Sequence, residues 1–145
     1  MSTNSRLIEA PVEKVWDVLA DGWLYPLFVV GASRMRDVEE SWPAVDATLH
    51  HSVGVWPALI DDSTTVLECV PHERLKLRAR GWPAGEAEVT FLLDAQDGAT
   101  EVTIVEDAVS GPGLLVPKPL RDIQLSWRNV ETLRRLAFVA ERREG

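Results

Sequence analysis

The spacing of hydrophobic residues along the chain has two patterns. It is helical near the start and at the end of the chain, and it is strand-like in between. Near the start, four apolar residues recur at i, i+3, i+4 and i+7 and form one stripe of a helix: Val12, Val15, Trp16 and Leu19. Pro11 suits the first position of this helix, and Gly22 interrupts the pattern at its end. Residues 3–9 are compatible with a preceding strand, and residues 23–28 predict a short second helix or an apolar elbow.

From residue 29 to residue 108 the hydrophobic period changes to two, and turn residues recur between the alternating segments. The pattern predicts six successive antiparallel strands, at residues 33–39, 47–55, 64–70, 75–80, 87–91 and 101–105. Turns are expected at residues 61–63, 71–73, 81–85 and 97–98. The last of these is the dipeptide Asp97-Gly98, which is a strong hairpin signal.

A long amphipathic helix is predicted over residues 120–141. We expect its apolar stripe to be buried against the sheet, and the stripe consists of Ile123, Trp127, Val130, Leu133, Leu136 (or Ala137) and Ala140. At roughly 1.5–3 kcal/mol per buried large side chain, this stripe should be the main tie between helix and sheet. The order strand, helix, short helix, six strands, long helix predicts an α+β fold. In this fold a curved antiparallel sheet of about seven strands carries the helices on one face.

The length and composition fit an ordinary globular protein. The chain has 145 residues, so we expect residues 1–145 to form a single domain. No uncharged apolar run approaches the ~20 residues that span a bilayer, which argues against integral membrane association. Residues 1–6 lack the apolar stretch of a signal peptide, and Cys69 stands alone, which excludes an internal disulfide. Together these features predict a cytoplasmic location.

The charge is acidic overall and unevenly distributed. The formal net charge is −8, which disfavours binding to nucleic acid. Residues 118–145 hold seven Lys or Arg against four Asp or Glu, whereas residues 1–117 hold 8 against 19. One interpretation of the basic last segment is an anion- or membrane-binding patch. The interpretation we favour is a solvated face of the last helix, with arginines toward the negative end of the helix dipole.

Four motifs carry a resemblance to a known superfamily: residues 8–19 (IEAPVEKVWDVL), 68–71 (ECVP) with Arg74-Leu75, 98–103 (GATEVT) and 128–136 (RNVETLRRL). Their order resembles the START-like (SRPBCC) superfamily, which includes Bet v 1 relatives and bacterial polyketide cyclase/dehydrase and lipid-transport proteins. The last motif is similar to the closing helix of actinobacterial members. The resemblance covers nearly the whole chain and implies the helix-grip fold. Because this fold hosts carriers, cyclases, hydrolases, dehydratases and co-chaperones, the function must be argued from the site.

No motif predicts a metal site, covalent catalysis or a bound cofactor. His50 and His51 are neighbours on a predicted strand, so their side chains point to opposite faces and cannot easily chelate one ion. Zinc needs three or four ligands, and only His72 and Cys69 remain as natural candidates. The Gly-x-Ser-x-Gly elbow and the glycine-rich phosphate loops are absent. Cys69 itself is expected to be a small core residue.

His51 and Glu106 are the two candidates for acid–base chemistry. His51 shares its side of the predicted strand with Leu49 and Val53, and Glu106 shares its side with Ile104, so both are predicted to face the interior. A buried histidine and a buried glutamate would need each other or water. If they pair, they form an acid–base couple in which the pKa of the histidine is raised. The alternative is a polar pocket lining or a position at the sheet end near solvent.

Tryptophan is frequent, with six in the chain. Trp16 and Trp127 lie on apolar helix stripes and are expected in the core. Trp42, Trp56 and Trp82 each precede a proline at the end of a predicted strand, where they either frame the mouth of a pocket or cap the core. The residues expected to line a ligand site are Trp23, Tyr25, His51, Val53, Trp56, Trp82, Phe91, Glu106, Trp127 and Val130.

Three hypotheses of function remain open. The leading one is binding of a hydrophobic or aromatic small molecule, lipid- or polyketide-like, in a cavity between the sheet and the last helix. The second is a polyketide cyclase/dehydratase-type enzyme that uses His51 and Glu106 as acid–base groups. The third is a ligand-free, co-chaperone-like interaction module, which should have a filled interior and an exposed apolar patch. We expect a monomer or a homodimer.

Overall fold

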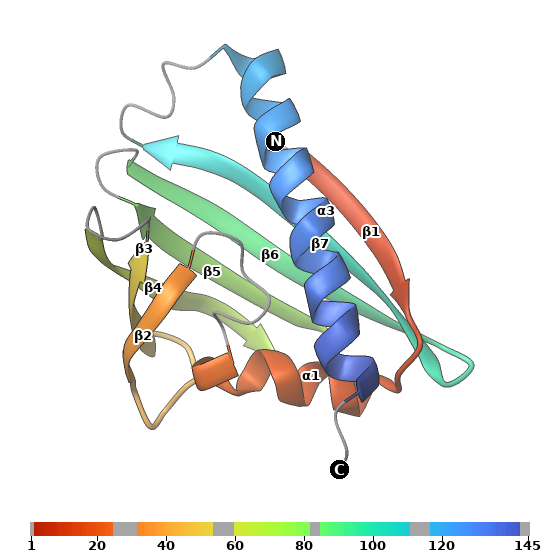
Figure 1. The fold of residues 1–145 in the computed structure, drawn as a ribbon. Coiled ribbons are helices and arrows are strands. Elements are labelled where there is room, and N and C mark those ends of the chain that lie inside the picture. Colours follow the sequence, from red (N-terminus) through yellow and green to blue (C-terminus); the bar gives the residue numbers. More distant parts are fainter. Residues whose placement is uncertain (1, 25–31, 54–59, 82–84, 111–116, 143–145) are drawn as a thin grey trace.

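The computed structural model describes residues 2–24, 32–53, 60–81, 85–110 and 117–142 (Figure 1). In this part of the chain, antiparallel strands form one curved seven-stranded sheet in the order β1-β7-β6-β5-β4-β3-β2. The strands are β1 (Ser2–Ile8), β2 (Ala32–Val38), β3 (Thr48–Val53), β4 (Ile60–Val70), β5 (Arg74–Gly81), β6 (Gly85–Gln96) and β7 (Ala99–Ser110). The first strand therefore forms one edge of the sheet and pairs with the last strand.

The described helices are α1 (Val12–Ala20), the 3-10 helix η1 (Gly22–Leu24) and α3 (Lys118–Arg142). Figure 1 shows α3 crossing the sheet beside β1 and β7, with α1 at one end of the sheet against the C-terminal part of α3. This arrangement confirms the predicted α+β helix-grip fold. None of the described helices is both long and apolar enough to cross a membrane.

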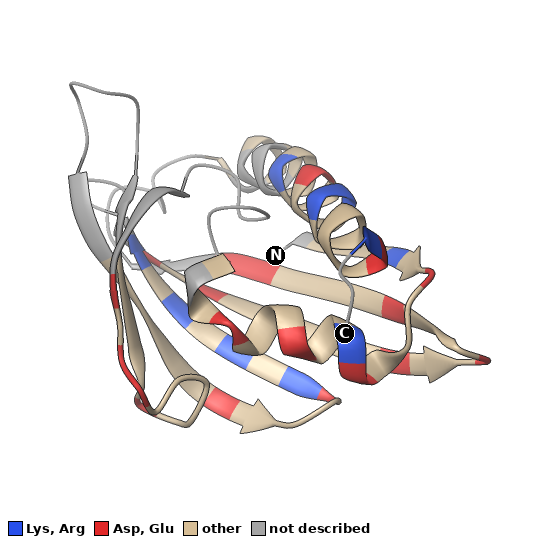
Figure 2. Ribbon diagram, turned by 60° about the horizontal axis from the view of Figure 1, so that its bottom comes forward, with Lys and Arg blue, Asp and Glu red and all other residues tan. Residues whose placement is uncertain are grey.

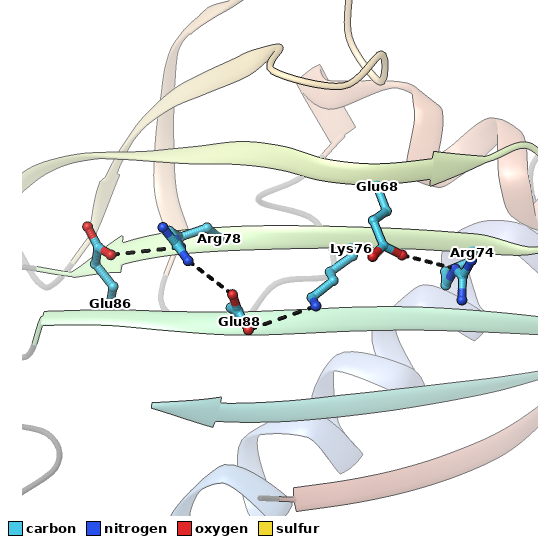
Figure 3. Close-up of polar contacts among 6 residues, drawn as sticks. All are labelled: Glu68, Arg74, Lys76, Arg78, Glu86 and Glu88. Atoms are coloured by element: carbon cyan, nitrogen blue, oxygen red, sulfur yellow. Dashed lines mark hydrogen bonds and ion pairs between the residues drawn. The ribbon is translucent and has the colours of Figure 1, made fainter. Parts of the chain in front are cut away.

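Strict alternation on β5 separates an apolar face from a charged face. Leu75 and Leu77 are buried, whereas Lys76 and Arg78 project from the opposite face and pair with Glu88 of β6 (Figure 3). Neighbouring strands continue the apolar face with Leu49, Val66, Phe91, Leu93, Val102 and Ile104, all buried. Because every second residue of each strand faces the same way, the concave face of the sheet becomes the core.

The start of the chain folds as its pattern predicts. Val15, Trp16 and Leu19 of α1 are buried, which confirms the apolar stripe. Gly22, which ends the pattern, lies so close to the core that an added Cβ would be 2.5 Å from Leu49 Cδ2. A side chain at this position would require the side chains of Leu49 and Val38 to shift, and glycine avoids this contact.

The turns are partly as predicted. Asp97 and Gly98 adopt φ angles of 50° and 84° and join β6 to β7, which confirms the predicted hairpin. The turn predicted at residues 61–63 is wrong, because these residues lie inside β4, which begins at Ile60 and pairs with β3. The backbone hydrogen bonds of this ladder outweigh the local turn preference of Asp and Ser.

The predicted burial of the last helix holds only for its second half. Leu133, Leu136, Ala137 and Ala140 are buried, as predicted. The first half of the stripe is a correction, because Ile123, Trp127 and Val130 are 67%, 70% and 53% exposed. The face of α3 that meets the sheet runs instead through two polar residues, Ser126 and Asn129, before it reaches Leu133.

Candidate functional site

The buried polar side chains of the described residues are Thr64, Thr100, Glu106, Asn129 and Thr132. Thr100 has a structural role, because its hydroxyl donates to the carbonyl of Ala10 over 2.9 Å. Glu106 and Asn129 differ from it, since Glu106 brings a carboxylate into the interior and Asn129 has a buried Nδ2 without a hydrogen-bond partner among the described residues. Burial of such groups is costly, so these two residues are candidates for a functional role.

Glu106 reaches the interior because it lies on the inner face of β7. It alternates with Val102 and Ile104, which are fully buried, and it is itself 3% exposed. In the ladder it lies between Ser2 of β1 and Val89 of β6. The prediction that Glu106 faces the interior is confirmed.

The partner of Glu106 is Arg128 of α3, whose Nη2 donates to Glu106 Oε2. The Arg128 side chain is 40% exposed, so the pair joins a buried carboxylate to a guanidinium that still reaches solvent. This contact is not predicted by the sequence pattern, because Arg128 belongs to the helix face expected to be solvated. The signal was the inward position of Glu106, since a buried carboxylate requires a cation or several donors.

Asn129 follows Arg128 and is 3% exposed. Three residues earlier on the same helix, the hydroxyl of Ser126 accepts a hydrogen bond of 2.9 Å from Asn4 Nδ2 of β1. The first half of α3 is thus held to the sheet by polar side chains, whereas its second half is held by apolar ones. Glu106, Arg128 and Asn129 are called the polar centre below.

The polar centre is rich in hydrogen-bond donors. The carboxylate of Glu106 is engaged by Arg128, and a guanidinium has five N–H donors, of which this contact uses one. The unpartnered Nδ2 of Asn129 adds further donors. Such a group of donors beside an apolar sheet face suits a ligand that carries an acceptor oxygen on a hydrophobic body.

His51 lies on β3, where the register pairs it with Asp62 of β4 and Met35 of β2. Between β3 and β7 the sheet has β4, β5 and β6. At about 4.8 Å per strand, His51 and Glu106 are roughly 19 Å apart along the sheet, so a contact would have to cross the concave side. The His51 side chain lies outside the described residues, and the predicted couple stays a prediction.

The other predicted site residues fall into three groups. Phe91 is 3% exposed and lies on the inner face of β6, opposite Ile104 of β7. Trp127 and Val130 are exposed, so they lie apart from the buried face of α3. The side chains of Trp23, Tyr25, Val53, Trp56 and Trp82 lie outside the described residues.

Trp42 has one of the two roles considered for tryptophans at strand ends. It is 8% exposed, and its Nε1 donates to the carbonyl of Leu19 over 3.3 Å. Trp42 therefore caps the core beside α1 and does not line the mouth of a pocket.

Cys69 is partly buried against the core, and burial raises the pKa of its thiol above the usual value. A raised pKa lowers the thiolate fraction, which argues against a nucleophile. Among the described residues, no three His, Cys, Asp or Glu gather in a way that would hold a metal ion.

The outer face of the sheet carries an ion-pair ladder across β4, β5 and β6 (Figure 3). Arg74 lies 3.3 Å from Glu68, and Arg78 lies 3.1 Å from Glu88. These side chains are about a third to a half exposed, so each pair contributes little to stability. Figure 2 shows the same bands on the sheet, with acidic residues along α1 and arginines along α3. The ladder is a solvated surface and gives no sign of a site.

Residues 9–114 match the model of one protein family, described as Activator of Hsp90 ATPase homolog 1-like protein. The match extends over most of the chain. The chain belongs to this family. It is thereby a member of the START-like superfamily, as its sequence motifs predict. A comparison with curated proteins finds no match.

Solved structures share the fold at low sequence identity. DynU16, from the dynemicin biosynthetic locus, is 22% identical with a TM-score of 0.69, over 97% of this chain and 47% of DynU16. BexL, a di-domain ARO/CYC from the BE-7585A biosynthetic pathway, is 20% identical with a TM-score of 0.67, over 98% of this chain and 50% of BexL. Ara h 8.0201 is 11% identical with a TM-score of 0.72, over 97% of both chains. This chain therefore spans about half the length of DynU16 and BexL.

Proposed function

We propose that this member of the family binds a hydrophobic small molecule between the concave face of the sheet and α3. The polar centre orients the ligand by donating hydrogen bonds to one of its oxygen atoms. The observation that carries the proposal is the unpartnered Nδ2 of Asn129, a buried residue that directly follows Arg128 of the Glu106–Arg128 pair on α3. An amide donor without a partner costs about 1–3 kcal/mol, and a ligand acceptor would recover that free energy on binding.

The surroundings of the polar centre support a ligand with an apolar body. The inner face of the neighbouring strands is made of Phe91, Leu77, Val102 and Ile104, all buried. A polar group on an otherwise apolar wall is the common arrangement of small-molecule sites. The fold similarity to BexL, an ARO/CYC protein, is consistent with an aromatic or polyketide-like ligand.

The enzyme hypothesis has weaker support. It needs Glu106 to exchange protons with a ligand or with His51, but the carboxylate already accepts a hydrogen bond from Arg128. A charged acceptor held in this way is suited to fixing Arg128 in place. We therefore assign binding to the polar centre and leave proton transfer out of the proposal.

Two fluorescent probes test the proposal: 8-anilinonaphthalene-1-sulfonate and N-phenyl-1-naphthylamine, which has similar rings and no sulfonate. We expect the natively folded protein to bind both probes with defined stoichiometry, and the sulfonate probe to depend on the polar centre. Asn129→Leu should weaken binding of the sulfonate probe roughly 5- to 150-fold, which corresponds to the ~1–3 kcal/mol of a lost buried hydrogen bond. The uncharged probe should be much less affected.

Arg78→Met is the matched control, because Arg78 is an ion-paired arginine on the outer face of the sheet. It should leave the affinity for both probes unchanged, and circular dichroism should show native folding of every variant. If the native protein binds neither probe, or only after partial unfolding, the interior is filled and the proposal is wrong. Native mass spectrometry of freshly purified protein would add the mass of any ligand that co-purifies.

A further inference from the structure

An exposed apolar ridge runs along α3. The first four of its apolar members recur every three or four residues, and the fifth lies eight residues further on. All five are between 49% and 70% exposed: Leu120, Ile123, Trp127, Val130 and Phe138. Arg134 fills the gap between Val130 and Phe138, and its side chain is 64% exposed. These six residues are called the outer ridge.

The outer ridge faces away from the polar centre. At 100° per residue, Arg128 lies on one flank of α3, where it reaches Glu106 of β7. Glu141 lies on the opposite flank together with the ridge, and its Oε2 accepts a hydrogen bond of 3.0 Å from the backbone of Glu9, just beyond edge strand β1. The outer ridge therefore lies beyond the sheet edge, on the solvent side of β1 and not over the concave face.

The exposed area of the ridge, with its polar rim, approaches that of one side of a protein–protein interface. A large aromatic side chain has a surface of about 150–250 Å². Trp127 and Phe138 are 70% and 58% exposed, so together they expose about 250 Å² of aromatic surface. With the three aliphatic residues, the ridge falls in the range of about 300–600 Å² found for the largest apolar patch of a monomer. Together with its polar rim, it approaches the ~800 Å² that each partner buries in a standard interface.

The ridge is also complementary to itself. If two copies of α3 pack antiparallel about a two-fold axis next to Val130, Ile123 of one copy faces Phe138 of the other. In the same register Trp127 faces Arg134, so the one charge in the ridge meets an indole face, which is a favourable cation–π contact. A two-fold axis makes each of these contacts twice.

The charges around the outer ridge favour a second copy of the chain over a membrane as its binding partner. Arg134 is paired with Glu131, which accepts two hydrogen bonds from it at 2.7 and 2.9 Å and a third from Arg135 at 3.0 Å. Glu141 on the ridge flank adds a negative charge, and Arg142 adds a positive one that lies over the Phe138 ring, 4.1 Å from its centroid. Acidic and basic residues are therefore mixed along the border of the ridge, whereas a surface that binds anionic lipids has a predominantly basic border.

We infer that the outer ridge is the interface of a homodimer, in which two α3 helices pack antiparallel around Val130. The inference is independent of ligand binding, because the ridge lies on the flank opposite Arg128 and outside the buried face that carries Asn129. It also explains why the apolar stripe predicted from the sequence to face the sheet is instead exposed along the first half of α3.

Sedimentation velocity of the full chain over a range of concentrations tests the inference. The unmodified protein should sediment as a dimer, and Trp127→Glu should convert it to a folded monomer. Val45→Glu is the matched control, because Val45 is 54% exposed and lies outside α3, and it should remain dimeric. If the unmodified protein is a monomer at every concentration, the inference is wrong. It is equally wrong if the monomer binds vesicles of anionic phospholipid through Trp127.

Cross-linking tests the register. In a Cys69→Ser background, Val130→Cys lies next to the proposed axis and should form a disulfide-linked dimer under mild oxidation. Phe138→Cys lies at the far end of the ridge, opposite Ile123, and should not link to its own copy. Linking by Phe138→Cys and not by Val130→Cys would overturn the antiparallel register.

Discussion

Glu106 and Arg128 form a charged pair whose two members have different surroundings. The carboxylate is 3% exposed, whereas the guanidinium side chain is 40% exposed. Removing the arginine would leave an uncompensated charge inside the core, whereas removing the glutamate would leave a guanidinium that can turn to water. The two residues are therefore unequal in what their loss costs the fold.

Arg128 and Glu106 should therefore differ in how much stability the fold loses when each is replaced. Arg128→Met should lower the free energy of unfolding by up to about 3 kcal/mol, because it strands the Glu106 carboxylate. The double variant Glu106→Leu/Arg128→Met should be more stable than Arg128→Met alone, since no buried charge remains. Chemical denaturation of both single variants and the double variant, combined as a double-mutant cycle, measures the coupling. Additive effects would show that the pair contributes nothing as a pair.

A second prediction concerns His51. If Arg128 is the partner of Glu106, the pKa of His51 should be the same in the unmodified protein and in Glu106→Gln. NMR titration of the three histidines measures this directly. A pKa of His51 above the ordinary ~6.5 that falls in Glu106→Gln would instead support the acid–base couple, because the carboxylate would then be stabilising the imidazolium.

At the site, strand periodicity predicted more than helix periodicity did. The inward position of Glu106 follows from its alternation with Ile104, because a strand has only two faces. Arg128 could not be found in this way, since a long side chain reaches around a helix and its partner is set by the tertiary packing. The same limit applies to Asn129, whose burial depends on how α3 is rotated about its axis.

Two parallel stripes of α3 are alternative candidates for the face that is buried against the sheet. The stripe that meets the sheet passes from Ser126 and Asn129 to Leu133 and Ala137, and the outer ridge lies beside it. Hydrophobicity alone favours Ile123 and Trp127 over Ser126 and Asn129 as the buried positions. A helical wheel therefore predicts the helix and its second half correctly and rotates its first half onto the wrong flank.

A matched pair of variants on α3 separates the two stripes. Leu133→Ala should lower the free energy of unfolding by about 2–5 kcal/mol, because Leu133 is 1% exposed and its loss leaves a cavity. Val130→Ala, three residues away and 53% exposed, should change it by less than about 0.5 kcal/mol at concentrations where the chain is monomeric. Equal losses for both variants would mean that both stripes are buried.

The same helix carries a pH-dependent contact. Hydrogen bonds from Arg134 and then Arg135 lower the pKa of Glu131 from 4.5 to about 2. Since the pKa is lower in the folded state, the stabilisation is complete above the pKa of the unfolded chain and is lost as the pH falls toward 2. NMR titration of the Glu131 carboxyl should give a midpoint near 2, and Arg134→Gln should raise it. An unchanged midpoint in that variant would remove Arg134 as the main cause.

For the whole molecule, the order of elements was predictable because each strand has its own alternation and each connection its own turn signal. The exception at residues 61–63 shows the limit of local preferences, since pairing between β3 and β4 extends through residues that favour a turn. The arrangement of the sheet around α3 was implied by the resemblance to the START-like superfamily, whereas the position of β1 at the sheet edge was not predicted. Local sequence carries no signal for contacts between segments a hundred residues apart.

That edge position has a consequence for how the chain folds as it is synthesised. β1 leaves the ribosome first, yet Ser2 pairs with Glu106, and Asn4 bonds to Ser126, 122 residues later. The contact between Glu9 and Glu141 spans 132 residues. The hairpins from β2 to β7 join neighbours in sequence and are free to close while translation continues, but β1 has no partner strand until β7 has emerged. Such long-range closure is slow, so the nascent chain must keep β1 unpaired while the six strands from β2 to β7 are synthesised. We expect chains stalled before β7 to be cleaved within β1 by a protease that spares this strand in the released protein.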